Sequence, residues 1–339
     1  MITGIALQDK DDSHDAVWKQ ALASAVRDPQ QLLSLLDLDE KKYRDQVSFN
    51  EKFKLLVPLS YVAKMKKGDW HDPLLRQVLP LKDESIKSFG FLADPVGDLN
   101  AEVSSGVLQK YHGRVLLITT GACAVHCRYC FRRHFPYANS VPDKAQWQQT
   151  LAGIKRDTTL TEVILSGGDP LMLSDDRLKA MCQDLANIPH ITTLRFHTRV
   201  PVLLPERLTP SFIKWLSALN VKIVMVVHAN HANELDDAFL SIMKKLSAIG
   251  VILLNQSVLL KSINDNVNKL VLLSQRLFDC GILPYYLHQL DKVQGAAHFD
   301  VSDKAMRKLQ QQLRERLPGY LMPRFVREVS GERYKLPLE

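Results

Sequence analysis

The sequence predicts an α/β fold in which six strand–helix units form a partial barrel. From about residue 113, short apolar and β-branched runs alternate with amphipathic stretches, and the later runs start about thirty residues apart, the length of one β-α unit. Six parallel β-α units indicate an incomplete barrel. The predicted strands start near Val115, Glu162, Thr193, Lys222, Val251 and Ile282.

The chain divides into three predicted segments. Residues 1–95 are expected to form an N-terminal helical region packed on the barrel, and a turn at 94–98 marks its end. The barrel occupies residues 96–295, and residues 296–339 form a helix and a tail that closes the barrel mouth. Helical patterns occupy residues 16–26, 30–38, 205–216, 234–246 and 303–317.

Composition places the chain among ordinary globular proteins. Its 339 residues, 46% of them hydrophobic, can bury a substantial core. Five cysteines, an odd number, argue against a disulfide scaffold and for a reducing compartment. Residues 1–12 show no signal-peptide pattern and no apolar run is long enough for a membrane span, so a cytoplasmic protein is expected. The net charge of +7 is spread along the chain, which makes nucleic acid a minority interpretation.

Polar side chains follow each predicted strand at its C-terminal end. That is the edge where β/α barrels carry their chemistry, so these residues are expected to converge on one site. In chain order they are the cysteines after the first strand, Gly167-Gly168-Asp169, His197-Thr198-Arg199, His228 with His231, Asn255-Gln256-Ser257, and Tyr286, His288 and Asp291.

Three cysteines, Cys123, Cys127 and Cys130, lie within one loop after the first strand. Three thiolates can hold three corners of a four-iron cluster and leave the fourth iron open, whereas a structural zinc site closes with four ligands. The alternatives are a zinc site completed by His126, His134 or a distant cysteine, and thiols that merely pack. The other two cysteines, Cys182 and Cys280, are isolated in apolar helical context, where a free thiol usually packs as a small hydrophobe.

The C-x3-C-x2-C spacing, with the aromatic Tyr129 before the last cysteine, resembles the signature of radical S-adenosylmethionine enzymes. That resemblance implies a 4Fe-4S cluster whose open iron binds S-adenosylmethionine. Gly167, Gly168 and Asp169 then match a Gly-Gly-Glu-like segment that contacts the methionine amine. Any strand-to-helix turn also favours Gly and Asp, and the position one unit after the cysteines favours cofactor contact.

With both motifs in place, residues 70–337 resemble the lysine 2,3-aminomutase family, and most closely its short bacterial branch. The segments that carry the likeness are 111–119, 130–133, 163–169, 255–260, 284–286 and the tail to Lys335. The resemblance implies a radical 1,2-shift of the α-amino group of L-lysine, giving (R)-β-lysine for modification of elongation factor P by a partner ligase. It further implies pyridoxal 5'-phosphate as a second cofactor, an electron donor, and the barrel of the radical S-adenosylmethionine type.

Lys335 matches the family lysine that carries pyridoxal phosphate, although the family's glycine run is reduced here to Gly331. An amine that attacks an aldehyde must lose its proton, so burial or a nearby cation is expected. The alternative is a solvated lysine near the chain end. Arg114 and Gln256 match positions that contact the same cofactor, and Ser257 is a nearby hydroxyl candidate.

Substrate contacts are likewise implied by the resemblance. Arg132 matches a carboxylate-binding arginine, and a guanidinium fork suits that group. Asp291 and Glu328 match two acidic positions that hold the distal ammonium of lysine, although the second is usually Asp. The alternative is that Arg132, its neighbour Arg133 and Glu328 are solvated surface charges.

Two other functions remain open on the sequence alone. A glutamate aminomutase would keep the cluster but need distal cations, against which Asp291 and Glu328 discriminate. A non-enzymatic iron–sulfur or zinc protein would explain the cysteines alone, but not the polar groups at successive strand ends. His228 and His231 have a spacing that could suggest a metal, yet no third ligand lies near them in sequence, so core histidines are expected.

Overall fold

A computed structural model describes residues 11–49 and 53–338, with side chains from Val17 onward. The segment 1–10, which supports the expectation of no signal peptide, lies outside the described residues. Within the part that the structure describes, no helix combines the length and apolar character needed to cross a bilayer.

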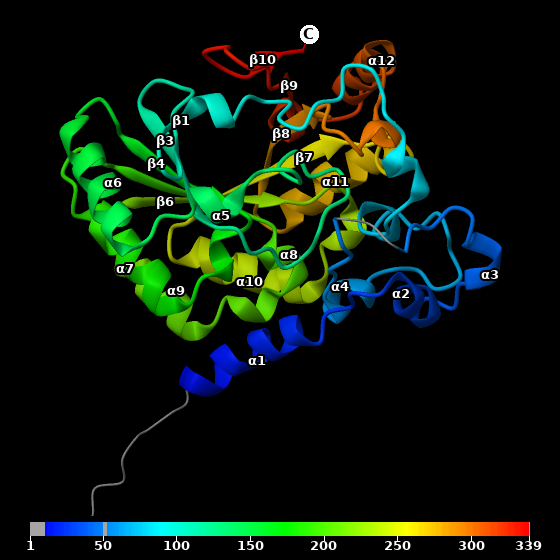
Figure 1. The fold of residues 1–339 in the computed structure, drawn as a ribbon, viewed down its shortest axis with the longest axis horizontal. Helices are drawn as coiled ribbons and strands as arrows, with labels where there is room; N and C mark the ends of the chain where they lie inside the picture. The colour runs from blue at the N-terminus through cyan, green and yellow to red at the C-terminus, as the bar shows by residue number, and fades with distance from the viewer. Residues whose placement is uncertain (1–10, 50–52, 339) are drawn as a thin grey trace, which may run out of the picture.

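One sheet of ten strands in sequence order forms the centre of the protein (Figure 1). The six predicted strands β3 to β8 pair in parallel and in order, which confirms the expected topology. Within the described residues β1 and β10 form the two edges, so the barrel is open. The strands are β1 (Glu102–Ser104), β2 (Val107–Leu108), β3 (Arg114–Thr120), β4 (Glu162–Gly167), β5 (Thr193–Thr198), β6 (Lys222–His228), β7 (Ile252–Leu259), β8 (Leu283–Gln289), β9 (Arg324–Arg327) and β10 (Leu336–Pro337).

The C-terminal tail adds strands that the sequence did not predict. Strand β9 pairs in parallel with β8, and β10 returns antiparallel beside β9, with Leu336 opposite Arg327. Strand β9 has an arginine at each end and β10 is only Leu336-Pro337, so both are too short for the apolar run by which the other strands were predicted. This hairpin sets Lys335 next to Glu328.

Helices on the outer side of the sheet join the parallel strands (Figure 1). Two predicted helices start later than expected, because capping side chains set their first turns. Thr209 accepts the N–H of Phe212 at the start of α9, and Asp236 accepts the N–H of Phe239 at the start of α10. The helices are α5 (Tyr137–Ser140), α6 (Lys144–Arg156), α7 (Asp175–Ala186), α8 (Val200–Leu203), α9 (Pro210–Ser217), α10 (Asp237–Ala248), α11 (Val267–Asp279) and α12 (Asp303–Arg314).

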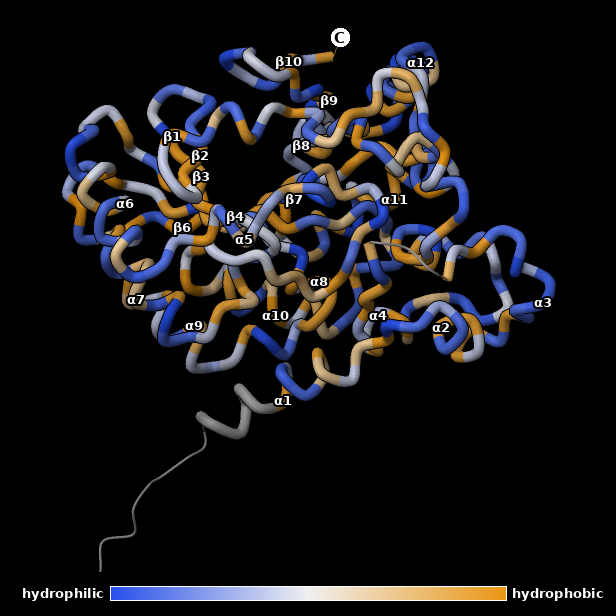
Figure 2. The backbone as a smooth tube through the Cα atoms, in the orientation of Figure 1, coloured by the Kyte–Doolittle hydropathy of each residue, from blue (hydrophilic) through white to orange (hydrophobic). Residues whose placement is uncertain are grey.

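The N-terminal region contains short helices joined by turns, and it shares the main hydrophobic core with the barrel. The helices are α1 (Asp11–Ala23), α2 (Pro29–Leu35), α3 (Glu40–Tyr43) and α4 (Leu59–Val62). One continuous cluster of buried apolar side chains runs from Val26 in this region to Ile282 before β8. Figure 2 shows the hydrophobic positions concentrated on the central strands and inner helix faces. The N-terminal helices therefore cover the barrel rather than fold around a separate core.

Candidate active site

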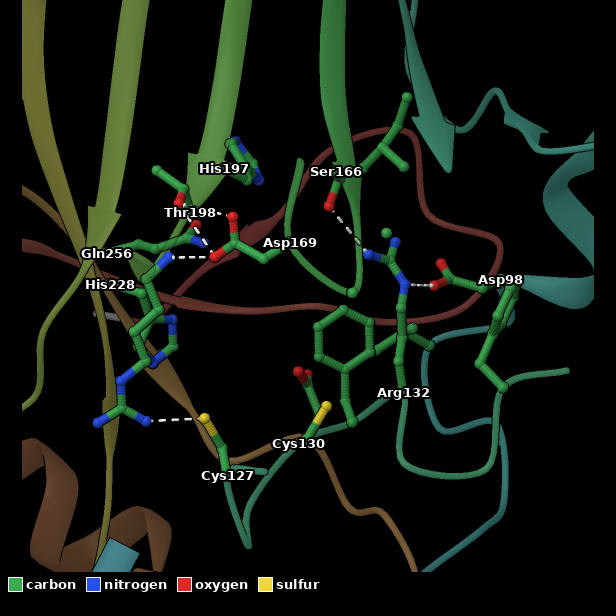
Figure 3. A pocket seen from close by; sticks show the side chains of 18 of the residues that line it. Asp98, Cys127, Cys130, Arg132, Ser166, Asp169, His197, Thr198, His228 and Gln256 are labelled. Atoms are coloured by element: carbon green, nitrogen blue, oxygen red, sulfur yellow. Dashed lines mark hydrogen bonds and ion pairs between the residues drawn. The ribbon is translucent and has the colours of Figure 1, made fainter. Parts of the chain in front are cut away.

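A cavity of about 520 Å³ lies at the C-terminal ends of the parallel strands. That volume suits a small-molecule site. Every residue to which the sequence assigned a cofactor, metal or substrate contact lines it except Ser257, as the close-up in Figure 3 shows for several of them. They are Arg114, Cys123, Cys127, Cys130, Arg132, Gly167, Gly168, Asp169, Gln256, Asp291, Glu328 and Lys335. Of the other polar residues expected at the strand ends, Asn255 and His231 do not line it.

The cysteine loop follows β3, and a buried ion pair between Arg128 in the loop and Glu84 fixes its position. Arg128 donates to both carboxylate oxygens of Glu84, at 2.8 and 2.5 Å, and both side chains are almost fully buried. The loop thereby presents Cys123, Cys127 and Cys130 to the cavity. Burial raises the pKa of Cys123 and raises that of Cys130 to about 11, so a cation is needed to hold these sulfurs as thiolates.

The zinc alternative finds no support in the loop geometry. Within residues 11–49 and 53–338, no three side chains of His, Cys, Asp or Glu converge on a single-ion site. His126 Nδ1 lies 2.8 Å from the carbonyl oxygen of Lys54, and His134 Nε2 lies 3.3 Å from that of Gln294. A four-iron cluster is wider than a single ion, so its thiols need not converge on one point, and all three cysteines line the same cavity.

Asp169 uses its carboxylate to shape the turn after β4. It accepts the Thr198 hydroxyl at 2.7 Å and the backbone N–H groups of Arg199 at 2.7 Å and Leu171 at 3.0 Å (Figure 3). Burial raises the pKa of Asp169 to about 6. Gly168 is required beside it, because a Cβ there would lie 2.3 Å from the carbonyl oxygen of Ala122. Because the Asp169 carboxylate already accepts these hydrogen bonds, a ligand would contact the backbone of this motif rather than its carboxylate.

Arg132 is a buried cavity residue rather than a surface cation. Only 8% of its side chain is exposed, Nε donates to Asp98 at 2.6 Å, and Nη1 donates to Ser166 at 3.1 Å (Figure 3). Asp98 also pairs with Lys110 at 2.7 Å. Burial would raise the pKa of Asp98, but Arg132 and Lys110 together hold it below its usual value. Sequence reasoning assigned Asp98 only to a turn.

A second part of the cavity lining, the acidic wall, carries Asp291, Glu328 and Lys335. Glu328 follows β9, accepts the Tyr111 hydroxyl at 2.8 Å and forms an ion pair with Lys335. Asp291 has no hydrogen-bond or ion-pair partner for its carboxylate among the described residues. Burial raises the pKa of Asp291 to about 7, with Lys335 opposing that rise. A buried carboxylate facing a cavity without a counterion is ready to receive a cation.

Comparison with known proteins yields long matches to one family, although no family model matches the chain. The chain is 48% identical over 323 residues to the L-lysine 2,3-aminomutase of Escherichia coli, which covers 95% of this chain and 94% of that protein. It is 45% identical to the Haemophilus influenzae enzyme of that name, over 93% of each chain. The chain belongs to the lysine 2,3-aminomutase family.

More distant relatives and solved structures are also similar. The L-lysine 2,3-aminomutase of Clostridium subterminale is 29% identical over 95% of this chain and 77% of that protein. Among solved structures, a radical SAM methyltransferase from Sphaerobacter thermophilus matches with a TM-score of 0.48 and 17% identity, covering 65% of this chain and 68% of its own.

In this member of the lysine 2,3-aminomutase family, two of the expected cofactor residues have free polar groups in the cavity. Arg114 lies over the ring of Tyr111, with 4.9 Å between its guanidinium carbon and the ring centroid. Neither its guanidinium nor the Gln256 amide has a hydrogen-bond partner within the described residues. The cavity therefore offers an uncompensated cation suited to an anionic group such as a phosphate.

Ser257 does not fit the expected role. Neighbouring residues of a strand point to opposite faces, so Gln256 faces the cavity and Ser257 faces away from it. The Ser257 hydroxyl is buried, donates to the carbonyl oxygen of Ala229 at 2.7 Å and accepts from Asn255 at 2.8 Å. Ser257 thus ties β7 to the end of β6.

Histidines of strands β5, β6 and β8 also line the cavity; they are His197, His228 and His288. Burial lowers the pKa of each, to about 3 for His228, so all three are neutral. His231 accepts the N–H of Asn233 at 3.2 Å and is not in the cavity. His228 and His231 thus have different surroundings, since one lines the cavity and the other caps the turn after β6.

Proposed function

We propose that this protein is an L-lysine 2,3-aminomutase that converts L-α-lysine to (R)-β-lysine. The proposal rests on one cavity that is lined by three sets of side chains. They are the thiols of Cys123, Cys127 and Cys130, the amine of Lys335 with the carboxylates of Asp291 and Glu328, and the buried guanidinium of Arg132. Membership of the lysine 2,3-aminomutase family supports the same reaction.

The thiols Cys123, Cys127 and Cys130 would hold a 4Fe-4S cluster, because they come from one loop and all three line the same cavity. With S-adenosylmethionine bound at its open iron, the cluster would supply the radical that starts and ends the hydrogen transfers. Gly167 and Gly168 bring backbone close to that region. The start of the thiol loop is held against the turn after β4, because the backbone N–H of Asp169 donates to the carbonyl oxygen of Ala122 at 2.9 Å.

Lys335, Arg114 and Gln256 would hold pyridoxal phosphate, with the lysine amine toward the aldehyde and the free guanidinium toward the phosphate. When bound, this cofactor would carry the amino group during its migration. The structure sets Lys335 beside the anionic Glu328, whereas the sequence argument expected burial or a cation. If Lys335 were joined to the cofactor, the carboxylate oxygen of Glu328 that it contacts would become available to the substrate ammonium. The other carboxylate oxygen would keep Lys110, at 3.4 Å, and the Tyr111 hydroxyl as partners.

Lysine itself would lie between Arg132 and the acidic wall. Arg132 uses Nε and Nη1 within the protein, and Nη2, which has no partner among the described residues, is left for the substrate carboxylate. Asp291 and Glu328 would take the distal ammonium. Their negative charge disfavours glutamate, whose distal group is itself an anion.

We further propose that the protein works in the cytoplasm with an external electron donor, and that a ligase attaches the β-lysine to elongation factor P. The chain is 48% identical to the Escherichia coli relative but 29% identical to the Clostridium subterminale relative.

Anaerobic incubation with L-lysine, both cofactors and a reductant, followed by chiral chromatography, tests the reaction. Formation of (R)-β-lysine is expected. Only S product would refute the short-branch assignment, and conversion of glutamate but not lysine would refute the substrate. Mass spectrometry of elongation factor P, after addition of the ligase and the product, tests the downstream step.

A further inference from the structure

Arg199 is the most heavily bonded side chain near the cysteine loop. It follows β5 and is 6% exposed. Its Nη1 donates to the sulfur of Cys127 at 2.7 Å, shown as a dashed line to Cys127 in Figure 3, and to the hydroxyl of Tyr129 at 2.6 Å. The sequence placed Arg199 at a strand end without giving it a role.

The other side of the guanidinium is fixed by the N-terminal region and by the turn after β6. Its Nη2 donates to the Tyr61 hydroxyl at 3.0 Å, to Gln77 Oε1 at 2.8 Å and to Glu234 Oε2 at 3.0 Å. Glu234 is fully buried and is the only carboxylate paired with Arg199 among the described residues. A guanidinium held at this many points keeps one orientation toward the sulfur.

Arg199 also links the two predicted cofactor motifs. Its backbone N–H holds the carboxylate of Asp169, and its side chain holds Cys127. The network continues to the cavity, because the hydroxyl of Tyr129 lies 3.1 Å from Nε2 of the neutral His228. One residue thus fixes the position of a candidate iron ligand relative to the Gly-Gly-Asp turn.

We propose that Arg199 is a positioning residue for the iron–sulfur site, which orients the Cys127 sulfur and raises the reduction potential of the cluster. This inference rests on the proposed function. Hydrogen bonds to ligating sulfurs and nearby charge are among the protein features that set such potentials. Arg199 supplies both to one sulfur.

The sign of the effect follows from charge. When an external one-electron donor reduces the cluster, the site gains negative charge, and a buried cation at hydrogen-bond distance stabilises that state. Glu234 offsets part of this effect, since its carboxylate lies on the far side of the same guanidinium. Removing the cation should make reduction harder, and removing the carboxylate should make it easier.

The test is an anaerobic redox titration of the reconstituted protein, followed by electron paramagnetic resonance, with iron content measured on the same samples. Arg199→Gln is expected to shift the midpoint potential to more negative values, and Glu234→Gln to less negative values. Arg199→Lys keeps the positive charge but loses the planar guanidinium with its several N–H donors, so a smaller negative shift of the midpoint potential is expected. The matched control is Arg207→Gln, because Arg207 is also fully buried and ion-paired, with Asp175, but contacts no cysteine.

The possible failures are distinguishable. Wild-type protein without a cluster would overturn the proposed iron–sulfur site itself. A cluster whose potential is the same in wild type, Arg199→Lys and Glu234→Gln, or shifts equally in Arg207→Gln, would overturn the role of Arg199 alone. If Arg199→Gln does not fold, the opposite shifts of Arg199→Lys and Glu234→Gln decide the question.

Discussion

The two walls of the cavity are assembled in different ways. On one wall, Cys123, Cys127 and Cys130 come from a single loop, so a short stretch of chain brings all three thiols together. On the other, Asp291 follows β8, Glu328 follows β9, and Lys335 precedes β10. The first wall depends on local spacing, whereas the second exists only when the tail pairs with the sheet.

The walls also differ in charge. Burial raises the pKa values of Cys123 and Cys130 on the first wall and of Asp291 on the second, although each wall has a cationic side chain, Arg199 beside Cys127 and Lys335 beside Glu328. On the acidic wall Lys335 already neutralises Glu328. We infer that the cysteine wall requires a metal, whereas on the acidic wall the distal ammonium of the substrate would replace the amine of Lys335.

The largest expected effect is on the cysteine wall. Replacing Cys123, Cys127 or Cys130 by Ala should abolish the cluster, because each thiol holds one iron of a site that already has an open corner. Cys182→Ala and Cys280→Ala are the controls, since both thiols are buried away from the cavity. Iron analysis should give about four irons per chain for wild type and controls. Loss of iron in Cys182→Ala would contradict the assignment.

On the acidic wall, Lys335→Ala should abolish covalent attachment of pyridoxal phosphate. Borohydride reduction followed by peptide mass spectrometry should place the label on Lys335 in wild type and leave none in the variant. Lys292→Ala is the matched control, because Lys292 is a lysine close to the acidic wall that does not line the cavity. A label on Lys261 or Lys292, with an active Lys335→Ala enzyme, would refute the assignment.

Asp291→Asn should weaken lysine turnover strongly and leave the cluster and pyridoxal phosphate in place. Removing one charge of a desolvated ion contact costs about 2–5 kcal/mol, which is more than a tenfold loss of turnover. Steady-state kinetics measure the loss, and absorbance spectra check both cofactors. If lysine turnover and pyridoxal phosphate binding fell equally, Asp291 would be needed for the structure of the acidic wall rather than for binding lysine.

The same residue predicts a pH dependence. Burial raises the pKa of Asp291 to about 7, so lysine affinity should fall as the pH drops below about 7 and the carboxylate is protonated. Because that pKa is raised on folding, the ionised group opposes folding, and its contribution lowers stability as the pH rises from about 4 to about 7. Equilibrium dialysis and thermal unfolding of wild type and Asp291→Asn isolate these terms. Identical pH profiles for the two proteins would refute the prediction.

The smallest expected effect separates neighbouring residues of β7. Ser257→Ala should leave pyridoxal phosphate affinity unchanged and cost about 1 kcal/mol of stability, since its hydroxyl only joins β7 to β6. Gln256→Ala, which alters the cavity face, should weaken cofactor binding. Fluorescence titration with pyridoxal phosphate and chemical denaturation measure the two effects. Weaker binding in Ser257→Ala would mean that its face of the strand reaches the cofactor.

Local patterns in the sequence were sufficient to predict much of this protein. Apolar runs and their spacing predicted β3 to β8 in order, because a parallel strand and its crossover helix each have a readable length and periodicity. Placing polar residues at strand ends predicted most of the cavity lining, because the C-terminal ends of parallel strands meet at one edge. The thiol spacing predicted a metal loop for the same local reason.

Only the tertiary structure decided the rest. Asp98 and Arg199 became site residues through contacts with Arg132 and Cys127, more than thirty residues away in each case. The β9–β10 hairpin brought Lys335 to Glu328, although neither strand has a strong signal of its own. The sequence of a strand shows that its side chains alternate between two faces. Which face lines the cavity depends on the register and twist of the strand in the sheet, and in β7 that face includes Gln256 but not Ser257.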